Sequence, residues 1–181
     1  KLYLPKRRDT TAGLYRGRKA TGEKLSDYVS RKLWTPMHAE ESALWSLDRK
    51  DGMEKAYCCF NSNARDFARF GQLLLNNGQW DGQQLISPAY LAEATSPDTR
   101  LVYKDLGKPN HCYGFQYWIL DYKRMKIPYM RGILGQYVFT LPEKNAVIVR
   151  LGHKRSDTYT ADQHYPDDIN TWLDAAMDLL Q

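Results

Sequence analysis

Apolar positions in the first half of the chain recur at helical spacing. In residues 25–34, LSDYVSRKLW, they fall three or four positions apart, which predicts a helix that Pro36 ends. Residues 87–95, SPAYLAEAT, predict another short helix, in which Ser87 caps the start and Pro88 is the first helical residue.

The most strongly periodic helix is predicted over residues 64–78, ARDFARFGQLLLNNG. Asn63 is expected to cap its start, with Asp66 in the first turn, and Gly78 is expected to end it. Its predicted buried face consists of Phe67, Phe70 and Leu74.

The period changes from helical to alternating in the second half. Three runs rich in β-branched and aromatic residues, 112–120, 129–141 and 145–154, predict consecutive antiparallel strands. Residues 167–181, DDINTWLDAAMDLLQ, return to helical spacing and predict an amphipathic helix lying on that sheet. Its predicted apolar face consists of Ile169, Trp172, Leu173, Met177 and Leu180. The fold class predicted from this order is α+β.

Composition supports one globular domain. The chain has 181 residues, of which 43% are hydrophobic and 13% aromatic, enough for a packed core. No run of about 18 apolar residues occurs, so no membrane span is predicted. Cys58, Cys59 and Cys112 lack framework spacing, and we expect no disulfide scaffold, with Cys58 and Cys59 as small buried apolar residues. The histidines show no metal-ligand spacing, so neither a metal nor another cofactor is predicted.

The positive charge is concentrated at the start of the chain. Residues 1–24 hold eight basic and two acidic residues, whereas the whole chain has a net charge of +5. A basic arm of this kind can bind nucleic acid or a membrane surface, and the alternative is a solvated tail. We favour the tail, and predict no nucleic-acid partner.

The order of these segments resembles the β-lactamase-related serine hydrolases. That family includes class C β-lactamases, penicillin-binding-type carboxypeptidases, family VIII esterases and 6-aminohexanoate-dimer hydrolases. The resemblance covers residues 20–181, and its most specific parts are the stretch 64–91 and the strand pair 129–151. It implies the C-terminal part of a β-lactamase-like domain, a fold that is incomplete in this chain. The segments that carry it are ALWSLD (43–48), ARDFARFGQLLLNNGQWDGQQLISPAYL (64–91), YGFQYWI (113–119) and RGILGQYVFTLPEKNAVIVRLG (131–152).

The resemblance implies an acyl-serine mechanism. Family members acylate the serine of an S-x-x-K motif, a Y-x-N or Y-x-S tyrosine takes part in proton transfer, and a K-T-G or H-x-G strand shapes the pocket. No serine in this chain has a lysine three positions later. The third motif maps onto Ile133-Leu134-Gly135, where Ile133 replaces the cation or histidine. These three are candidate pocket residues, and Trp45 and Tyr113 are candidate pocket walls with a core role as the alternative.

The family order places the tyrosine motif over residues 4–13, which read LPKRRDTTAG. One choice of codons for this segment encodes Tyr-Gln-Ser-Gly-Glu-Thr-Gln-Leu-Leu-Gly in the neighbouring frame. One hypothesis is therefore that residues 1–19 are an out-of-frame reading, and the alternative is a diverged but genuine N-terminal segment. On either interpretation both S-x-x-K and Y-x-N/S are taken to be missing and no catalytic residue is intact.

These observations predict a hydrolase fragment or relative that is inactive as supplied. The parent chemistry is hydrolysis of an ester, amide or β-lactam, and the alternative is a non-catalytic module that binds a small ligand or peptide on the same fold. Apolar surface left uncovered on the sheet favours self-association. The resemblance further implies export to the periplasm.

Overall fold

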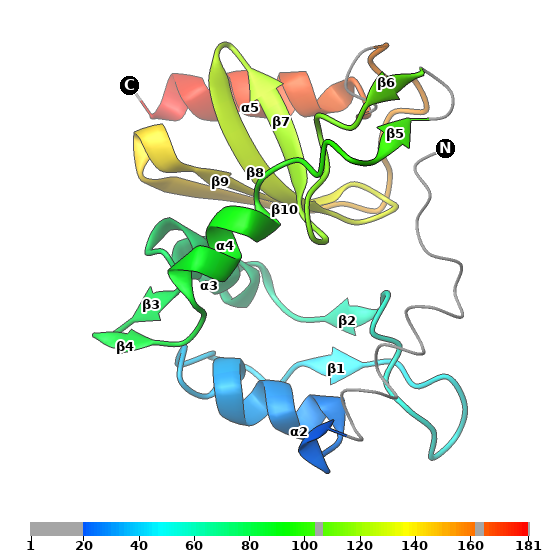
Figure 1. Cartoon of the computed structure of the whole chain (residues 1–181), viewed down its shortest axis with the longest axis vertical. Coiled ribbons are helices and arrows are strands. Elements are labelled where there is room, and N and C mark those ends of the chain that lie inside the picture. The colour runs from blue at the N-terminus through cyan, green and yellow to red at the C-terminus, as the bar shows by residue number, and fades with distance from the viewer. Residues whose placement is uncertain (1–19, 104–106, 162–164, 181) are drawn as a thin grey trace.

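A four-stranded antiparallel sheet forms the best-packed part of the chain (Figure 1). The computed structural model describes residues 20–103, 107–161 and 165–180. The strands lie in the order β10-β9-β8-β7, so neighbours in sequence are neighbours in the sheet. Their bounds are β7 Trp118–Tyr122, β8 Met125–Arg131, β9 Gln136–Leu141 and β10 Ala146–Leu151. The predicted α+β class and the antiparallel meander are confirmed.

The segment 129–141 was predicted as one strand, and this is wrong. The chain reverses at residues 132–135, which separate β8 from β9. The Gly132 backbone N–H donates to the Gln136 carbonyl at 2.7 Å, and Gly135 has a φ of +83° that favours glycine. The predicted strand 112–120 likewise begins only at Trp118, after a turn in which Gln116 has a φ of +65°.

Helix α5, Asp168–Leu179, covers one face of the sheet. Ile169 and Leu173 are fully buried against β8 and β9, as the helical spacing predicts. Trp172 departs from that prediction, because 43% of it is exposed. The residues that form this core with α5 come from all four strands: Leu120, Tyr122, Ile127, Tyr129, Tyr137, Phe139 and Leu141, with Ala146 and Ile148 packed against them.

Helix α3, Ala64–Leu75, packs on the opposite face, against β9 and β10. The Asn63 cap is confirmed, since its side-chain oxygen accepts from the Asp66 N–H at 2.8 Å. The predicted buried face is only half-buried, because Phe67 and Phe70 face the ring of Phe60 instead of the sheet. The fully buried positions of α3 are Asp66, Gly71 and Leu73, while Leu74 is half-buried.

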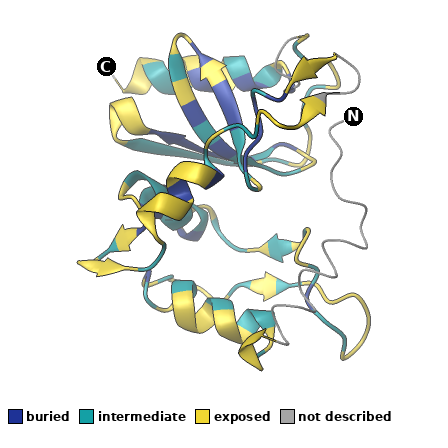
Figure 2. Cartoon of the chain, in the orientation of Figure 1, coloured by how far each residue is buried: buried dark blue, intermediate teal, exposed yellow. Residues whose placement is uncertain are grey.

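The first helix and several short hairpins are more exposed than the sheet, as Figure 2 shows. Helix α2, Leu25–Val29, continues as a π-helical segment, η1, Ser30–Trp34, so the predicted helix is confirmed, although none of its residues is buried. The helix predicted after Ser87 is α4, Pro88–Ala94. A short 3-10 helix, η2 Pro142–Lys144, joins β9 to β10. The paired short strands are β1 Leu44–Trp45 with β2 Phe60–Asn61, β3 Gln79–Trp80 with β4 Gln83–Gln84, and β5 Val102–Tyr103 with β6 Lys108–Pro109.

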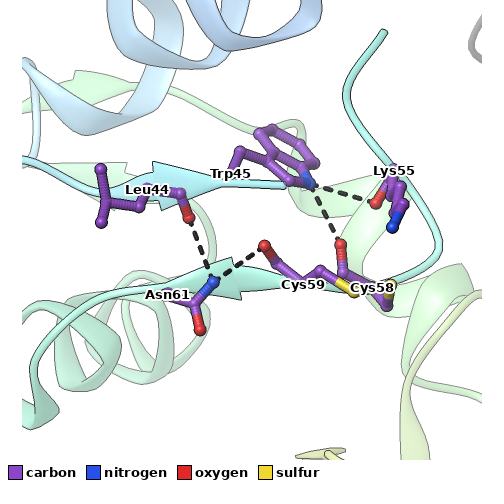
Figure 3. The surroundings of a disulfide bond; sticks show 6 residues. All are labelled: Leu44, Trp45, Lys55, Cys58, Cys59 and Asn61. Carbon is purple, nitrogen blue, oxygen red and sulfur yellow. Dashed lines mark hydrogen bonds between the residues drawn. A yellow bond between two sulfur atoms is a disulfide. The ribbon is translucent and has the colours of Figure 1, made fainter. Parts of the chain in front are cut away.

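Cys58 and Cys59 are joined by a disulfide (Figure 3). The expectation that both are small buried apolar residues without a disulfide is therefore wrong, and neither is fully buried. Adjacent cysteines follow no framework spacing, which is why spacing rules do not predict this bond. Cys112 is buried and lies outside this disulfide.

None of the helices in the described ranges has the length and apolar character needed to span a bilayer. The basic arm of residues 1–19, and with it the hypothesis of an out-of-frame reading, lies outside the described residues.

Candidate functional site

The three candidate pocket residues lie on the β8–β9 turn, at residues 132–135. Ile133 is 80% exposed and Leu134 is 50% exposed, so two large apolar side chains face outward together. Within the described part of the chain the Ile133 backbone N–H has no hydrogen-bond acceptor. The turn therefore presents apolar surface and an unused backbone donor side by side.

Long polar side chains brace this turn from behind. Gln136 accepts from the Leu134 N–H at 3.1 Å and donates from Nε2 to the Gly152 carbonyl at 2.5 Å. Arg155 donates from Nε to the Ile133 carbonyl at 2.9 Å, and Arg150 donates from Nη1 to the Gly135 carbonyl. Three side chains thus fix a turn that has few backbone hydrogen bonds of its own.

The two arginines are themselves held by aromatic rings. The Arg150 guanidinium lies 4.5 Å from the ring centroid of Trp172 and 5.7 Å from that of Tyr137. The Arg155 guanidinium lies 4.9 Å from the Tyr159 ring. Stacking of this kind orients a guanidinium and leaves it charged. Positive charge therefore lies immediately behind a motif position that is itself uncharged.

The phenol groups near the turn are kept neutral. Burial raises the pKa of Tyr137 to about 12, and the negative charge of Asp168 contributes in the same direction. Burial also raises the pKa of Tyr113. Neither phenol is poised to accept a proton near neutral pH, so neither has the property of a general base.

Tyr113 lies in the core beside the turn, which agrees with the alternative of a core role. It is 9% exposed, and its ring centroid is 4.7 Å from that of Trp118. The Arg131 guanidinium also contacts the Trp118 ring, at 3.5 Å from the ring centroid. Because Arg131 ends β8, this stack lies next to residue 132, where the turn begins.

Trp45 belongs to a different part of the molecule. It lies on β1, on the opposite side of α3 from the sheet in Figure 1, and its ring packs edge-on against Phe60 at 5.2 Å. Its indole N–H donates to the carbonyls of Lys55 and Cys58, both at 3.1 Å. The structure thus brings Tyr113 to the neighbourhood of the turn and gives Trp45 an anchoring role in the β1–β2 region.

A cavity of about 660 Å³ lies away from the turn, between η1 and the β3–β4 hairpin. At its border His38 Nε2 lies 3.0 Å from Asp81 Oδ2. Its lining combines charged and polar side chains with the apolar surfaces of Pro36 and Trp80, and none of the lining residues is buried. We therefore place the candidate site at the braced turn.

Sequence reasoning missed the residues that brace the turn. Neither Gln136 nor the arginines at 150 and 155 were singled out from the sequence. Arg150 did carry a signal, because it interrupts the apolar run NAVIVRLG at an otherwise buried-type strand position. Arg155 lies in the loop after β10, and its contact with Ile133 spans 22 residues, which no local pattern indicates.

The expectation that every Y-x-N/S motif is missing is wrong for the sequence as a whole. Tyr28-Val29-Ser30 matches Y-x-S. It lies in α2 and the start of η1, after the place that the family order gives the tyrosine motif. Tyr28 is 37% exposed, and the Arg31 guanidinium lies 5.6 Å from its ring.

Comparisons with known proteins support the fold of the chain. Over 137 residues the chain is 27% identical to a 6-aminohexanoate-dimer hydrolase of Paenarthrobacter ureafaciens. A solved structure of a Bacillus anthracis protein named as a 6-aminohexanoate-dimer hydrolase superposes on 92% of the chain with a TM-score of 0.73 and 27% identity. The chain is related to the β-lactamase-like serine hydrolases. A penicillin-binding protein homologue from Caulobacter crescentus aligns over 59% of the chain and 30% of its own length, with a TM-score of 0.45 and 21% identity.

The alignments with these hydrolase relatives are partial. They cover 74% of this chain and 34% of the Paenarthrobacter protein, and 40% of the Bacillus structure. The chain therefore spans well under half the length of the hydrolases that it matches. No protein-family model matches the sequence.

Proposed function

We propose that this chain forms one wall of an acyl-serine hydrolase site, and that the 132–135 turn holds the substrate there. The observation that carries the proposal is the bracing of that turn. Three side chains fix its backbone, while Ile133 and Leu134 stay exposed on its outer side.

The physical reason is preorganisation. A hydrogen-bond donor stabilises a developing oxyanion best when it is already fixed in place, because no reorganisation is then needed during the reaction. The Ile133 N–H is a donor of this kind. It has no acceptor among the described residues, and Arg155 fixes the residue by donating to the Ile133 carbonyl. The apolar side chains beside it suit the hydrocarbon part of a small substrate.

The substrate class follows from the relatives. The parent chemistry is hydrolysis of an ester, amide or β-lactam, and the name 6-aminohexanoate-dimer hydrolase makes that dimer the first compound to test. A small-molecule ligand agrees with a turn that offers a few exposed side chains and no extended groove.

The same proposal predicts that the 181-residue chain has no acyl-serine activity, because it contains no S-x-x-K motif. Purified chain should hydrolyse nitrocefin, a p-nitrophenyl ester and the 6-aminohexanoate dimer no faster than buffer, and a fluorophosphonate should label no serine. Rapid hydrolysis that a fluorophosphonate abolishes would contradict this part of the proposal.

Binding at the turn is tested separately from turnover. The 6-aminohexanoate dimer should raise the melting temperature of the chain, and Ile133→Asp should remove most of that rise without lowering the melting temperature of the free protein. Leu179→Asp is the matched control, since Leu179 is 86% exposed at the end of α5. Equal stabilisation of both variants would place the ligand elsewhere, and stabilisation without product in every assay would favour the non-catalytic binding module.

A further inference from the structure

The disulfide between Cys58 and Cys59 lies within reach of solvent. Cys59 is an exposed residue and Cys58 is half-buried, at the end of the loop that leads into β2. Cys112, by contrast, is only 2% exposed and lies outside the disulfide. A thiol reagent in solution can therefore reach the bonded pair and not the third cysteine.

The backbone of the bonded pair holds two neighbouring segments together (Figure 3). The Cys58 carbonyl accepts from the Trp45 indole N–H at 3.1 Å. The Cys59 carbonyl accepts from the Ser46 backbone N–H and from the Asn61 side-chain amide, both at 3.0 Å. Both carbonyls thus carry hydrogen bonds that fix β1 next to β2.

The direction of these carbonyls depends on an unusual backbone conformation. Cys59 has a φ of +73°, in the left-handed region that residues with a Cβ rarely adopt. The disulfide closes a small ring that includes the peptide bond between the two cysteines, and this ring limits the conformations open to Cys59. Once the ring opens, Cys59 is free to return to negative φ, and the two carbonyls then turn away from their donors.

We propose that Cys58 and Cys59 form a thiol–disulfide exchange site whose redox state sets the position of Trp45. The natural reactant is a dithiol reductant of low molecular weight or a dithiol protein. The disulfide holds the indole on the Cys58 carbonyl and against Phe60. Reduction takes the Cys58 carbonyl away from the indole, whose N–H then keeps only the Lys55 carbonyl as an acceptor, so the ring can move. This inference is independent of the hydrolase role proposed above.

The reaction balances as a two-electron exchange. A thiolate of the reductant attacks the sulfur of Cys59, the more exposed residue of the pair, the Cys58–Cys59 bond breaks, and the Cys58 sulfur leaves and takes up a proton. The second thiolate of the reductant then attacks the reductant sulfur that is bonded to Cys59 in the mixed disulfide. The Cys59 sulfur leaves and is protonated, and the reductant ends as a disulfide.

The test combines alkylation with fluorescence on the native chain. Before reduction, iodoacetamide should label no cysteine, and after dithiothreitol it should label Cys58 and Cys59 but not Cys112, as read by peptide mass spectrometry. Reduction should also shift the tryptophan emission to longer wavelength as the Trp45 indole becomes hydrated. The shift should be lost in Trp45→Phe, although four other tryptophans remain.

Two further variants separate the backbone effect from the thiols. The double variant Cys58→Ala with Cys59→Gly should have the same tryptophan emission wavelength as the oxidised native protein, because glycine adopts positive φ without a disulfide. Dithiothreitol should not change that wavelength. Cys112→Ser should respond like the native chain. Labelling of Cys58 and Cys59 before reduction, resistance of the bond to dithiothreitol in the folded protein, or an undiminished shift in Trp45→Phe would each overturn the proposal.

Discussion

A single buried carboxylate, Asp66, joins the start of α3 to the loop before it. It is 0% exposed, and its oxygens accept from the backbone N–H groups of Glu40 at 2.8 Å and Glu41 at 3.1 Å. The Asn63 side chain, the Arg69 guanidinium and, at 3.5 Å, the Ser62 hydroxyl also donate to it. Five donors converge on one side chain, so the charge is stabilised locally although it is buried.

We expect Asp66→Asn to lower the free energy of unfolding by about 1–3 kcal/mol, because an amide cannot accept from all these donors and its own N–H₂ group faces them. Urea denaturation followed by circular dichroism measures the change. Asp178→Asn, at an exposed position of α5, is the control and should change stability by less than about 0.5 kcal/mol. Equal stability of the Asp66 variant and the native chain would contradict the inferred role.

The same carboxylate gives a pH dependence with a defined sign. Burial raises the pKa of Asp66, but the Glu40 and Glu41 N–H donors, Asn63 and Arg69 outweigh it, so the pKa is lower in the folded chain than in the unfolded one. Its contribution is therefore complete above the unfolded pKa of about 4 and is lost as the pH falls through the folded pKa. Below pH 4 the native chain should lose stability more steeply than Asp66→Asn.

Single residues also show what the sequence reveals about the site. Asn63 could be identified as a cap because its acceptor and the Asp66 N–H lie three positions apart. Ile133, Leu134 and Gly135 could be proposed as site residues because the resemblance supplied a motif. Arg155 could not, since its contact with Ile133 depends on how the loop after β10 folds back.

The packing of α3 on the sheet depends on the small size of one residue. A Cβ on Gly71 would lie 2.5 Å and 2.9 Å from the two methyl carbons of Val147, and 3.3 Å from a methyl of Val138. Alanine favours a helix over glycine by about 1 kcal/mol, but overpacking a helix against a sheet opposes that gain by about 1–3 kcal/mol. The clash is expected to dominate.

We therefore predict that Gly71→Ala lowers the thermal midpoint, and that adding Val147→Ala recovers part of the loss by making room for the new methyl group. Differential scanning calorimetry of the two single variants and the double variant measures this coupling. Arg65→Ala, at a position whose side chain is 82% exposed in the same helix, is the control for helix propensity alone. Strict additivity of the two substitutions would show that the helix does not contact β10 at Gly71.

Helices and strands could be predicted where one hydrophobic period runs through the whole segment. They could not be predicted where the chain reverses inside an apolar run. Helices α3, α4 and α5 repeat apolar positions at helical spacing over their length, so local pattern located them. The segment 129–141 is mostly apolar, and apolar content alone does not separate two strands from one. Its reversal depends on Gly132, Gly135 and the side chains that brace them, and so on tertiary contacts.

At the scale of the whole molecule, exposed apolar side chains gather near one end of the sheet. Ile133 and Leu134 lie on the β8–β9 turn, and Leu151, 42% exposed, is the last residue of β10 and pairs with Gln136 beside that turn. Tyr159 is 40% exposed and stacks on Arg155, which contacts Ile133. Strand β10 is also an edge of the four-stranded sheet. An apolar patch next to a strand edge favours association with another polypeptide.

The last prediction is that the chain self-associates in a concentration-dependent way through this end of the sheet. Sedimentation equilibrium should show the association, and the double variant Ile133→Asp with Leu151→Asp should weaken it about tenfold or more, because burying two charges of the same sign at one interface is unfavourable. Leu179→Asp should leave the association unchanged, since its apolar side chain lies at the far end of α5. A stable monomer at every concentration would show that the patch does not bind a second copy. Association that survives the double variant would place the contact at another surface, because the two substitutions change the patch and leave the core of the sheet intact.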